Sequence, residues 1–81
     1  MGKLPEPAET LDLTGIPCPQ NTARVLLKLE WMDPGEVLEI IIDDGEPKEN
    51  VPPELEDEGH TILASTKQQD RWKLLVKRGD D

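Results

Sequence analysis

Apolar and polar positions change their spacing several times along this chain, and each change predicts a new element. Residues 11–13 alternate Leu, Asp and Leu, the period of a short strand, which we expect to end before Gly15. From Pro19 to Met32 the apolar positions recur at helical spacing and share one broad face: Val25, Leu26, Leu29 and Met32. The opposite face is expected to be polar, with Asn21, Arg24 and Lys28. Asp33-Pro34-Gly35 then predicts the end of the helix.

The strongest strand signal covers residues 36–42, where Leu38, Ile40 and Ile42 occupy alternate positions and are expected to face the core. Two further strands are expected at residues 61–66 and 71–77, joined near Gln68-Gln69-Asp70. In the last strand the basic side chains alternate with apolar ones and are expected to face water: Arg71, Lys73 and Lys77.

The segment between these strands contains Pro47, Pro52 and Pro53, which are not expected to lie together inside one helix. A helix capped by Asn50 would place Pro52 and Pro53 in its first turn, where the missing N–H groups have no partner to lose. This second helix is therefore expected to end at Glu58.

The element order is strand, helix, strand, helix, strand, strand, so the predicted fold class is a two-layer α/β sandwich. A four-stranded mixed sheet is expected to carry both helices on one face. Eighty-one residues suffice for one small domain, which we expect over residues 10–78, between a flexible N-terminal arm (residues 1–9) and a short C-terminal tail (residues 79–81).

The charge is strongly acidic, with 18 Asp and Glu against 9 Lys and Arg, for a net charge of −9. This balance argues against direct nucleic-acid binding, which depends on Lys and Arg contacts with phosphates. No apolar run is long enough to cross a membrane or resembles a secretory leader, so we expect a cytoplasmic protein with no membrane partner. The acidic run at residues 43–58 is either a solvated face or a surface that steers a basic partner.

Cys18 is the only cysteine, and it lies between Pro17 and Pro19 at the start of the first predicted helix. A lone thiol excludes an internal disulfide and favours a reducing compartment. The first turn of a helix stabilises a thiolate, and Pro19 suits the first helical position. The thiol is therefore expected to be exposed and reactive, although a buried, inert cysteine is the simpler alternative.

The strand ending in Asp12-Leu13-Thr14-Gly15, the following Ile16-Pro17-Cys18-Pro19, the helix and the Gly59-His60 step resemble the TusA-like (SirA-type) sulfur carriers over residues 10–78. In that family the motif is Cys-Pro-x-Pro, whereas this chain has Asn21 in place of the second proline. Cys-Pro-x-Asn, together with the stretches at residues 43–47 and 50–52, resembles a variant branch of the family.

The resemblance implies that Cys18 accepts sulfane sulfur as a persulfide from a cysteine desulfurase or rhodanese and passes it to an acceptor protein. It implies a relay protein of the sulfurtransferase type that needs no cofactor, and we expect it to be a monomer. Gly15, Pro17, Pro19 and Asn21 would shape the loop around the thiol, and Arg24 and Lys28 are candidate partner contacts.

Other chemistries find less support in the sequence. A cysteine hydrolase would need a base, and the only histidine, His60, is expected at the entry to the third strand. One Cys and one His do not complete a metal site, so no metal is expected. A peroxide sensor would need a resolving thiol from outside the chain.

A non-catalytic docking or regulatory module, in which Cys18 is incidental, stays open as the alternative. Arg24, Lys28 and Trp31 would then form its contact surface, unless Trp31 simply covers the end of the core. Intact mass after exposure to a persulfide donor distinguishes the two functions.

Overall fold

The elements of the fold follow one another in the predicted order. The computed structural model describes residues 6–17 and 20–79. The elements are β1 (Glu9–Asp12), α1 (Gln20–Glu30), β2 (Val37–Asp43), α2 (Glu46–Asp57), β3 (Thr61–Gln68) and β4 (Arg71–Lys77). The βαβαββ order is therefore confirmed. No helix of the described part of the chain is long and apolar enough to cross a membrane.

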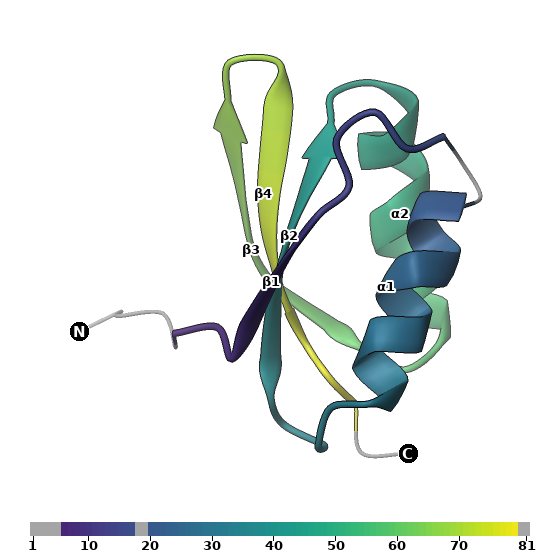
Figure 1. Ribbon diagram of the computed structural model, residues 1–81, viewed down its shortest axis with the longest axis vertical. Coiled ribbons are helices and arrows are strands. Elements are labelled where there is room, and N and C mark those ends of the chain that lie inside the picture. The colour runs from purple at the N-terminus through teal and green to yellow at the C-terminus, as the bar shows by residue number, and fades with distance from the viewer. Residues whose placement is uncertain (1–5, 18–19, 80–81) are drawn as a thin grey trace.

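The four strands form one mixed sheet in the order β1-β2-β4-β3. β1 runs parallel to β2, whereas β4 lies antiparallel to both β2 and β3. Both helices lie on the same face of this sheet, which gives the predicted two-layer sandwich (Figure 1). The parallel β1–β2 pair places the loops that follow these two strands at one edge of the molecule.

The core lies between the sheet and the two helices and is almost entirely aliphatic. Its fully buried side chains alternate along the central strands and recur on the helices: Leu38, Ile40, Ile42, Leu74 and Val76 from the sheet, and Val25, Leu29, Val51 and Leu55 from the helices. The alternating strand patterns also predict burial of Leu11, Leu13, Ile62 and Trp72. Leu13 is buried, whereas the other three are only partly buried and pack against the edge of this core.

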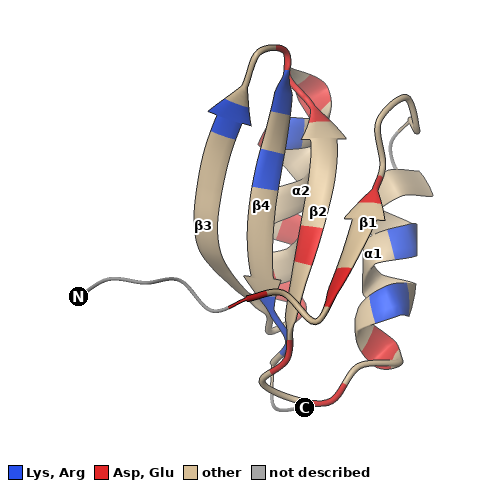
Figure 2. Cartoon of the chain, turned by 60° about the vertical axis from the view of Figure 1, so that its left-hand side comes forward, with Lys and Arg blue, Asp and Glu red and all other residues tan. Residues whose placement is uncertain are grey.

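The opposite face of the sheet carries no helix (Figure 2), and the strand registers place most of the sheet's charged residues on it. Arg71 and Lys77 are exposed there as expected, but Lys73 is half-buried, with its Nζ 3.8 Å from a carboxylate oxygen of Glu39. Val37 and Leu75 are 6% and 8% exposed on this face, so it is not polar throughout.

Helix α2 begins earlier than predicted. It starts at Glu46, after Gly45 as its N-cap, and it contains Pro52 and Pro53 within its length. The expected start at Asn50 was therefore wrong. Pro47 lies in the first turn at no cost, and the two later prolines forfeit two helix hydrogen bonds that burial of Val51 and Leu55 outweighs.

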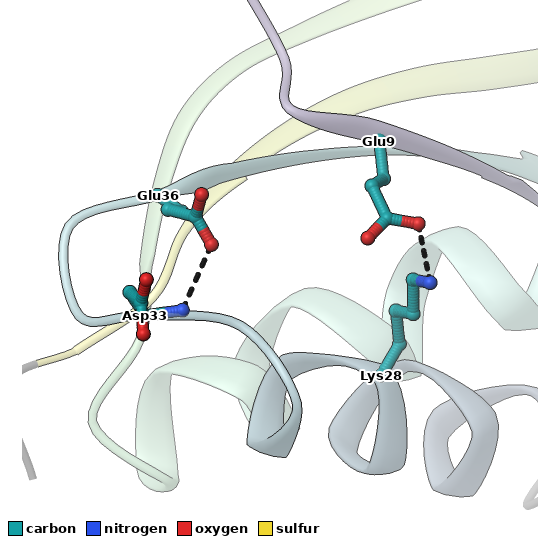
Figure 3. Close-up of polar contacts among 4 residues, drawn as sticks. All are labelled: Glu9, Lys28, Asp33 and Glu36. Carbon is teal, nitrogen blue, oxygen red and sulfur yellow. Dashed lines mark hydrogen bonds and ion pairs between the residues drawn. The ribbon is translucent and has the colours of Figure 1, made fainter.

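Two other boundaries differ from the sequence pattern. β1 spans Glu9–Asp12 instead of residues 11–13, because the Ala8 N–H already donates to the Val37 carbonyl at 2.7 Å. α1 ends at Glu30, and the predicted stop follows it as a turn in which the Asp33 N–H donates to the Glu36 carboxylate at 2.8 Å (Figure 3). The predicted arm, domain and tail boundaries stay predictions.

Candidate functional site

The loop between β1 and α1 begins with a tight turn built on Asp12. The Asp12 carboxylate accepts hydrogen bonds from the backbone N–H of Thr14, at 2.9 Å, and from the Thr14 hydroxyl. The Thr14 hydroxyl is the main reason why the pKa of Asp12 lies below its ordinary value, and the Thr14 backbone N–H contributes further. The Ile16 N–H then donates to the Leu13 carbonyl at 3.1 Å, so the chain turns back over the end of the sheet.

Gly15 connects this loop to the end of the neighbouring strand. Its N–H donates to a carboxylate oxygen of Asp43, the last residue of β2, at 2.7 Å. Gly15 has φ of 80°, a conformation that side chains rarely adopt, while a Cβ there would meet no atom within 4 Å. Glycine is therefore required for its backbone conformation and not for space. The loop is fixed to β2 by this one carboxylate and by the Leu13 N–H, which donates to the Ile41 carbonyl at 2.8 Å.

The loop leads into α1 through the Cys18-Pro19 dipeptide. Cys18 and Pro19 lie outside the described residues, so the expected exposure of the thiol stays a prediction. The residues on either side, Pro17 and Gln20, are both exposed, and Gln20 is the first residue of α1. The first helical turn is closed by the Asn21 N–H, which donates to the Pro17 carbonyl at 3.1 Å.

Asn21 is fully buried, so its expected place on the polar face was wrong. It lies four and eight residues before Val25 and Leu29, which puts all three on the buried face of α1. Its Oδ1 accepts the Thr22 N–H at 2.6 Å, whereas its Nδ2 has no hydrogen-bond partner among the described residues. A buried amide donor of this kind is costly to leave unpaired.

Arg24 and Lys28 lie on the outer side of α1, as expected. Arg24 is exposed, while Lys28 is half-buried and forms an ion pair with Glu9 at the start of β1 (Figure 3). Leu27 and Trp31 lie beside them and are 59% and 83% exposed. Trp31 therefore does not cover the end of the core, which was one of the two expectations for it.

His60 lies at the other end of α1 from this loop. It lines a polar cleft with Glu30 and Arg78, and its Nδ1 accepts the Gly79 N–H at 3.0 Å. Burial is the main cause that lowers the pKa of His60, and the positive charge of Arg78 lowers it further. The negative charge of Glu58 acts in the opposite direction and raises it. An α-helix rises 1.5 Å per residue, so His60 is about 15 Å along α1 from its first residue and is badly placed as a base at the loop. Within the described residues no three metal-ligating side chains come together.

The part that Asp43 plays was not predicted. The sequence placed Asp43 after the second strand, in an acidic run and in a stretch that resembles a variant branch of the family, whereas in the structure its side chain accepts the Gly15 N–H of the β1–α1 loop. The contact follows from the parallel pairing of β1 and β2, which puts the carboxyl ends of the two strands side by side and which the local sequence does not reveal. The Asp12–Thr14 turn, by contrast, could have been predicted from the spacing of an acidic residue two positions before a threonine.

A two-layer α/β domain, with its one cysteine directly before the first helix, has the build of a small thiol carrier. A sequence model of the family described as Sulfurtransferase TusA matches residues 9–78. A protein of Archaeoglobus fulgidus that is named as a sulfur carrier protein is 39% identical over 74 residues, which cover 90% of this chain and 84% of that protein. The chain belongs to the TusA family of sulfur carriers.

Further relatives agree with this assignment and with the fold. A second Archaeoglobus fulgidus protein named as a sulfur carrier is 26% identical, over 84% of this chain and 93% of its own. The crystal structure of a SirA-like protein from Desulfitobacterium hafniense superposes with a TM-score of 0.74 at 22% identity, covering 89% of this chain and 99% of the other. A solution structure from Helicobacter pylori gives 0.71 at 24% identity, covering 86% and 96%. The predicted fold class is confirmed.

Proposed function

We propose that Cys18 accepts sulfane sulfur as a persulfide and relays it to a partner protein. The observation that carries this proposal is the family match over residues 9–78, which takes in Cys18 and the whole of α1. The exposure of Pro17 and Gln20 on either side of the Cys18-Pro19 dipeptide supports it, because a carrier thiol has to be reached by two successive partners.

The transfer is an exchange reaction that needs no external oxidant or reductant. The Cys18 thiolate attacks the outer sulfur of the donor's persulfide; a new S–S bond forms at Cys18, and the old one breaks. The donor sulfur leaves as a thiolate, and the proton of the outer sulfur remains with the transferred atom. In the second half, an acceptor nucleophile attacks that outer sulfur and Cys18 leaves as a thiolate. A chain with one cysteine cannot resolve its own persulfide as an internal disulfide.

The loop residues would shape this site. Gly15, fixed by Asp43, and the restricted φ of Pro17 and Pro19 would hold the approach to the thiol in one conformation. Asn21 replaces a proline of the family motif, and its N–H makes a helix hydrogen bond with Pro17 that proline could not donate. The variant motif would therefore preserve the helix start and add one bond to it.

The partners would be a sulfur donor of the cysteine desulfurase or rhodanese type and a downstream acceptor protein. With a net charge of −9, the carrier is not expected to bind nucleic acid directly, so any modification of RNA would be made by the acceptor. We place the protein, as a monomer, in the cytoplasm, where the lone thiol stays reduced.

Intact-mass analysis tests the proposal. Incubation with sodium polysulfide should add one sulfur atom to the protein, and dithiothreitol should remove it. Cys18→Ser is the matched control, because it changes one atom and leaves the neighbouring loop contacts in place; it should take up no sulfur and unfold at the same urea concentration. No adduct on the parent protein would contradict the carrier role and favour the docking module.

The pH dependence of alkylation measures how the thiol is activated. The first turn of α1 favours a thiolate, whereas the carboxylates of Asp12 and Asp43, which hold the preceding loop, oppose it. One oxygen of Asp43 already accepts the Gly15 N–H, so we expect the helix end to dominate by a modest margin. The rate of alkylation by iodoacetamide should therefore show an inflection below the roughly 8.5 of an unperturbed cysteine. An inflection at or above that value would mean that the thiol is not activated.

A further inference from the structure

The amide of Asn21 carries the one buried side-chain polar atom that the described part of the chain leaves without a hydrogen-bond partner, its Nδ2. Its Oδ1 accepts the Thr22 N–H at 2.6 Å, and the Thr22 hydroxyl donates to the same oxygen at 3.4 Å. Only the amide oxygen can accept these bonds, so the NH2 group is the other end of the amide. Asn21 is fully buried, and a buried donor without an acceptor is costly. The orientation of the amide is thus fixed, while its donor still lacks an acceptor.

The place of Asn21 in α1 indicates which group completes this hydrogen bond. Its backbone N–H donates to the Pro17 carbonyl at 3.1 Å, a bond between residues four apart that closes one α-helical turn. Cys18 belongs to this span of the sequence, three positions before Asn21 and four before Thr22. Positions three and four apart in a helix lie on the same side. We therefore expect the sulfur of Cys18 on the side of α1 that carries the Asn21 amide, one turn nearer the start of the helix.

The first turn of α1 offers this sulfur fewer backbone donors than an ordinary helix start does. Pro19 has no N–H, and the N–H of Asn21 is already bonded to Pro17. A side-chain amide adds a donor at a place where the backbone supplies few. The sulfur of a neutral thiol is a weak acceptor, whereas hydrogen bonds to ionised groups are about twice as strong as those between neutral groups. The amide therefore favours the states in which the sulfur of Cys18 carries negative charge.

From these observations, and resting on the proposed function, we propose that the Asn21 Nδ2–H group donates a hydrogen bond to the Cys18 sulfur when that atom is a thiolate. This state occurs twice in the relay, before the carrier is loaded and again as an acceptor takes the sulfur away. In the second step the acceptor nucleophile bonds to the outer sulfur, the S–S bond breaks, and its electron pair passes to the Cys18 sulfur. Asn21 stabilises this leaving group and so governs how readily the carrier gives up its sulfur. A proline at this position, as in the family motif, has no side-chain donor to offer.

The pH dependence of alkylation tests the effect on the free thiol. Asn21→Leu has nearly the shape of the parent residue and keeps the backbone N–H that bonds to Pro17, but its side chain cannot donate. The inflection in the rate of alkylation by iodoacetamide should rise by about one pH unit relative to the parent protein. Thr22→Val is the matched control, because it removes a hydroxyl from the neighbouring buried residue and keeps the Thr22 N–H that holds Asn21. It should leave the inflection unchanged.

Release of the sulfur is measured with cyanide as the acceptor. The parent protein and both variants are loaded with sodium polysulfide, freed of the excess and mixed with potassium cyanide, and the thiocyanate formed is followed as its iron complex. A carbon–sulfur bond forms as the S–S bond breaks, and the outer sulfur leaves as thiocyanate while its proton passes to the solvent. Asn21→Leu should release sulfur about 5- to 10-fold more slowly than the parent, because its leaving thiolate has lost a donor. Thr22→Val should release it at the parent rate.

Stability separates this chemical role of the amide from a structural one. Replacing a buried donor that has no acceptor by an apolar side chain of similar shape is close to neutral or stabilising. Asn21→Leu should therefore unfold at the same urea concentration as the parent protein or at a higher one. If this variant instead unfolds at a lower urea concentration, with the alkylation inflection and the release rate unchanged, the amide is bonded within the fold and the proposal is overturned.

The outcomes also separate this proposal from the carrier function on which it rests. If the parent protein takes up no sulfur from polysulfide, the carrier function fails and the role of Asn21 at release fails with it. If the parent loads and releases sulfur but Asn21→Leu matches it in both the alkylation inflection and the rate of thiocyanate formation, the carrier stands and the donor role of Asn21 is wrong. Equally slow release by Thr22→Val would show a general disturbance of the first turn, which also overturns the proposal.

Discussion

Helix α1 is held in one way at its C-terminal end and in another at its N-terminal end. At the C-terminal end, the Arg78 Nε–H donates to the Leu29 carbonyl at 2.6 Å, so a charged side chain caps the helix. The same Arg78 accepts the Gly35 N–H with its own carbonyl, and Gly79 donates to His60. Three separate segments of the chain thus converge on this end and close it.

At the N-terminal end, backbone N–H groups of the loop donate to two carboxylates, those of Asp12 and Asp43, and the last described residue of the loop, Pro17, is exposed. No side chain from another element caps this end within the described residues. The difference shows that the two ends of α1 have different tasks. Contacts with the rest of the fold hold the C-terminal end, which leaves the N-terminal end available for chemistry. The predictions below separate these two ends.

The largest effect should come from the core that supports both ends. Ile40 is fully buried in β2, between Leu11 and Leu74 on the neighbouring strands. Ile40→Ala should lower the free energy of unfolding by about 2–5 kcal/mol, the range for truncating a buried aliphatic side chain. Urea denaturation measures this loss, and amide hydrogen exchange should speed up at both ends of α1 together. A loss below about 1 kcal/mol would mean that β2 is not central to the core.

Gly79→Ala should affect the C-terminal end alone. A Cβ on Gly79 would come within 2.1 Å of the Gly59 carbonyl oxygen, so one of the two backbones has to move. We expect a loss of about 1–3 kcal/mol, as for other overpacked sites. Hydrogen exchange should quicken near His60 and Arg78 while loading by polysulfide stays at the parent rate. A slower loading rate would show that the two ends are coupled.

Gly15→Ala is the matching substitution at the N-terminal end, and here the loss of stability has a different cause. No atom would clash with the new Cβ, but φ of 80° is unfavourable for alanine by about 1 kcal/mol. The loop should relax and weaken its bond with Asp43, so polysulfide loading should slow while exchange near His60 is unchanged. Equal loading rates would show that the loop conformation does not matter for the thiol.

The smallest effect should be a pH dependence confined to the C-terminal end. Because burial and Arg78 hold the pKa of His60 below 6.5, the unfolded chain binds the proton more readily than the folded one. The contribution of neutral His60 to the free energy of unfolding should be fully present above pH 6.5. It should be lost as the pH falls through that value towards the pKa of the folded state. His60→Asn keeps an acceptor for the Gly79 N–H without titrating and should flatten this part of the curve, measured by urea denaturation.

The sequence pattern was sufficient for the element order, because the periods of residues 11–13, 19–32 and 36–42 differ clearly. It failed for α2, since proline's local cost is evident in the sequence whereas the burial of Val51 and Leu55 that outweighs it depends on the whole fold. It also failed for Asn21, whose polarity suggested the outer face although its spacing from Val25 placed it inside.

At the candidate site, the sequence identified the residues but not the contacts among them. Cys18 and its flanking prolines are evident from their context, and Gly15 from its place after a strand. The bond between Gly15 and Asp43 joins residues 28 positions apart, and it follows only from the parallel pairing of β1 and β2. Long-range pairing of this kind is set by the tertiary fold and has no local signature.

The strand order β1-β2-β4-β3 has a consequence for how the protein is made. β4 is the last strand to be synthesised, yet it is the partner of both β2 and β3. Until β4 has left the ribosome, β2 lacks its antiparallel neighbour, and the apolar run from Val37 to Ile42 offers an unpaired edge to other nascent chains. The sheet is therefore completed only after β4 has been made, and a chain truncated before Arg71 is expected to aggregate.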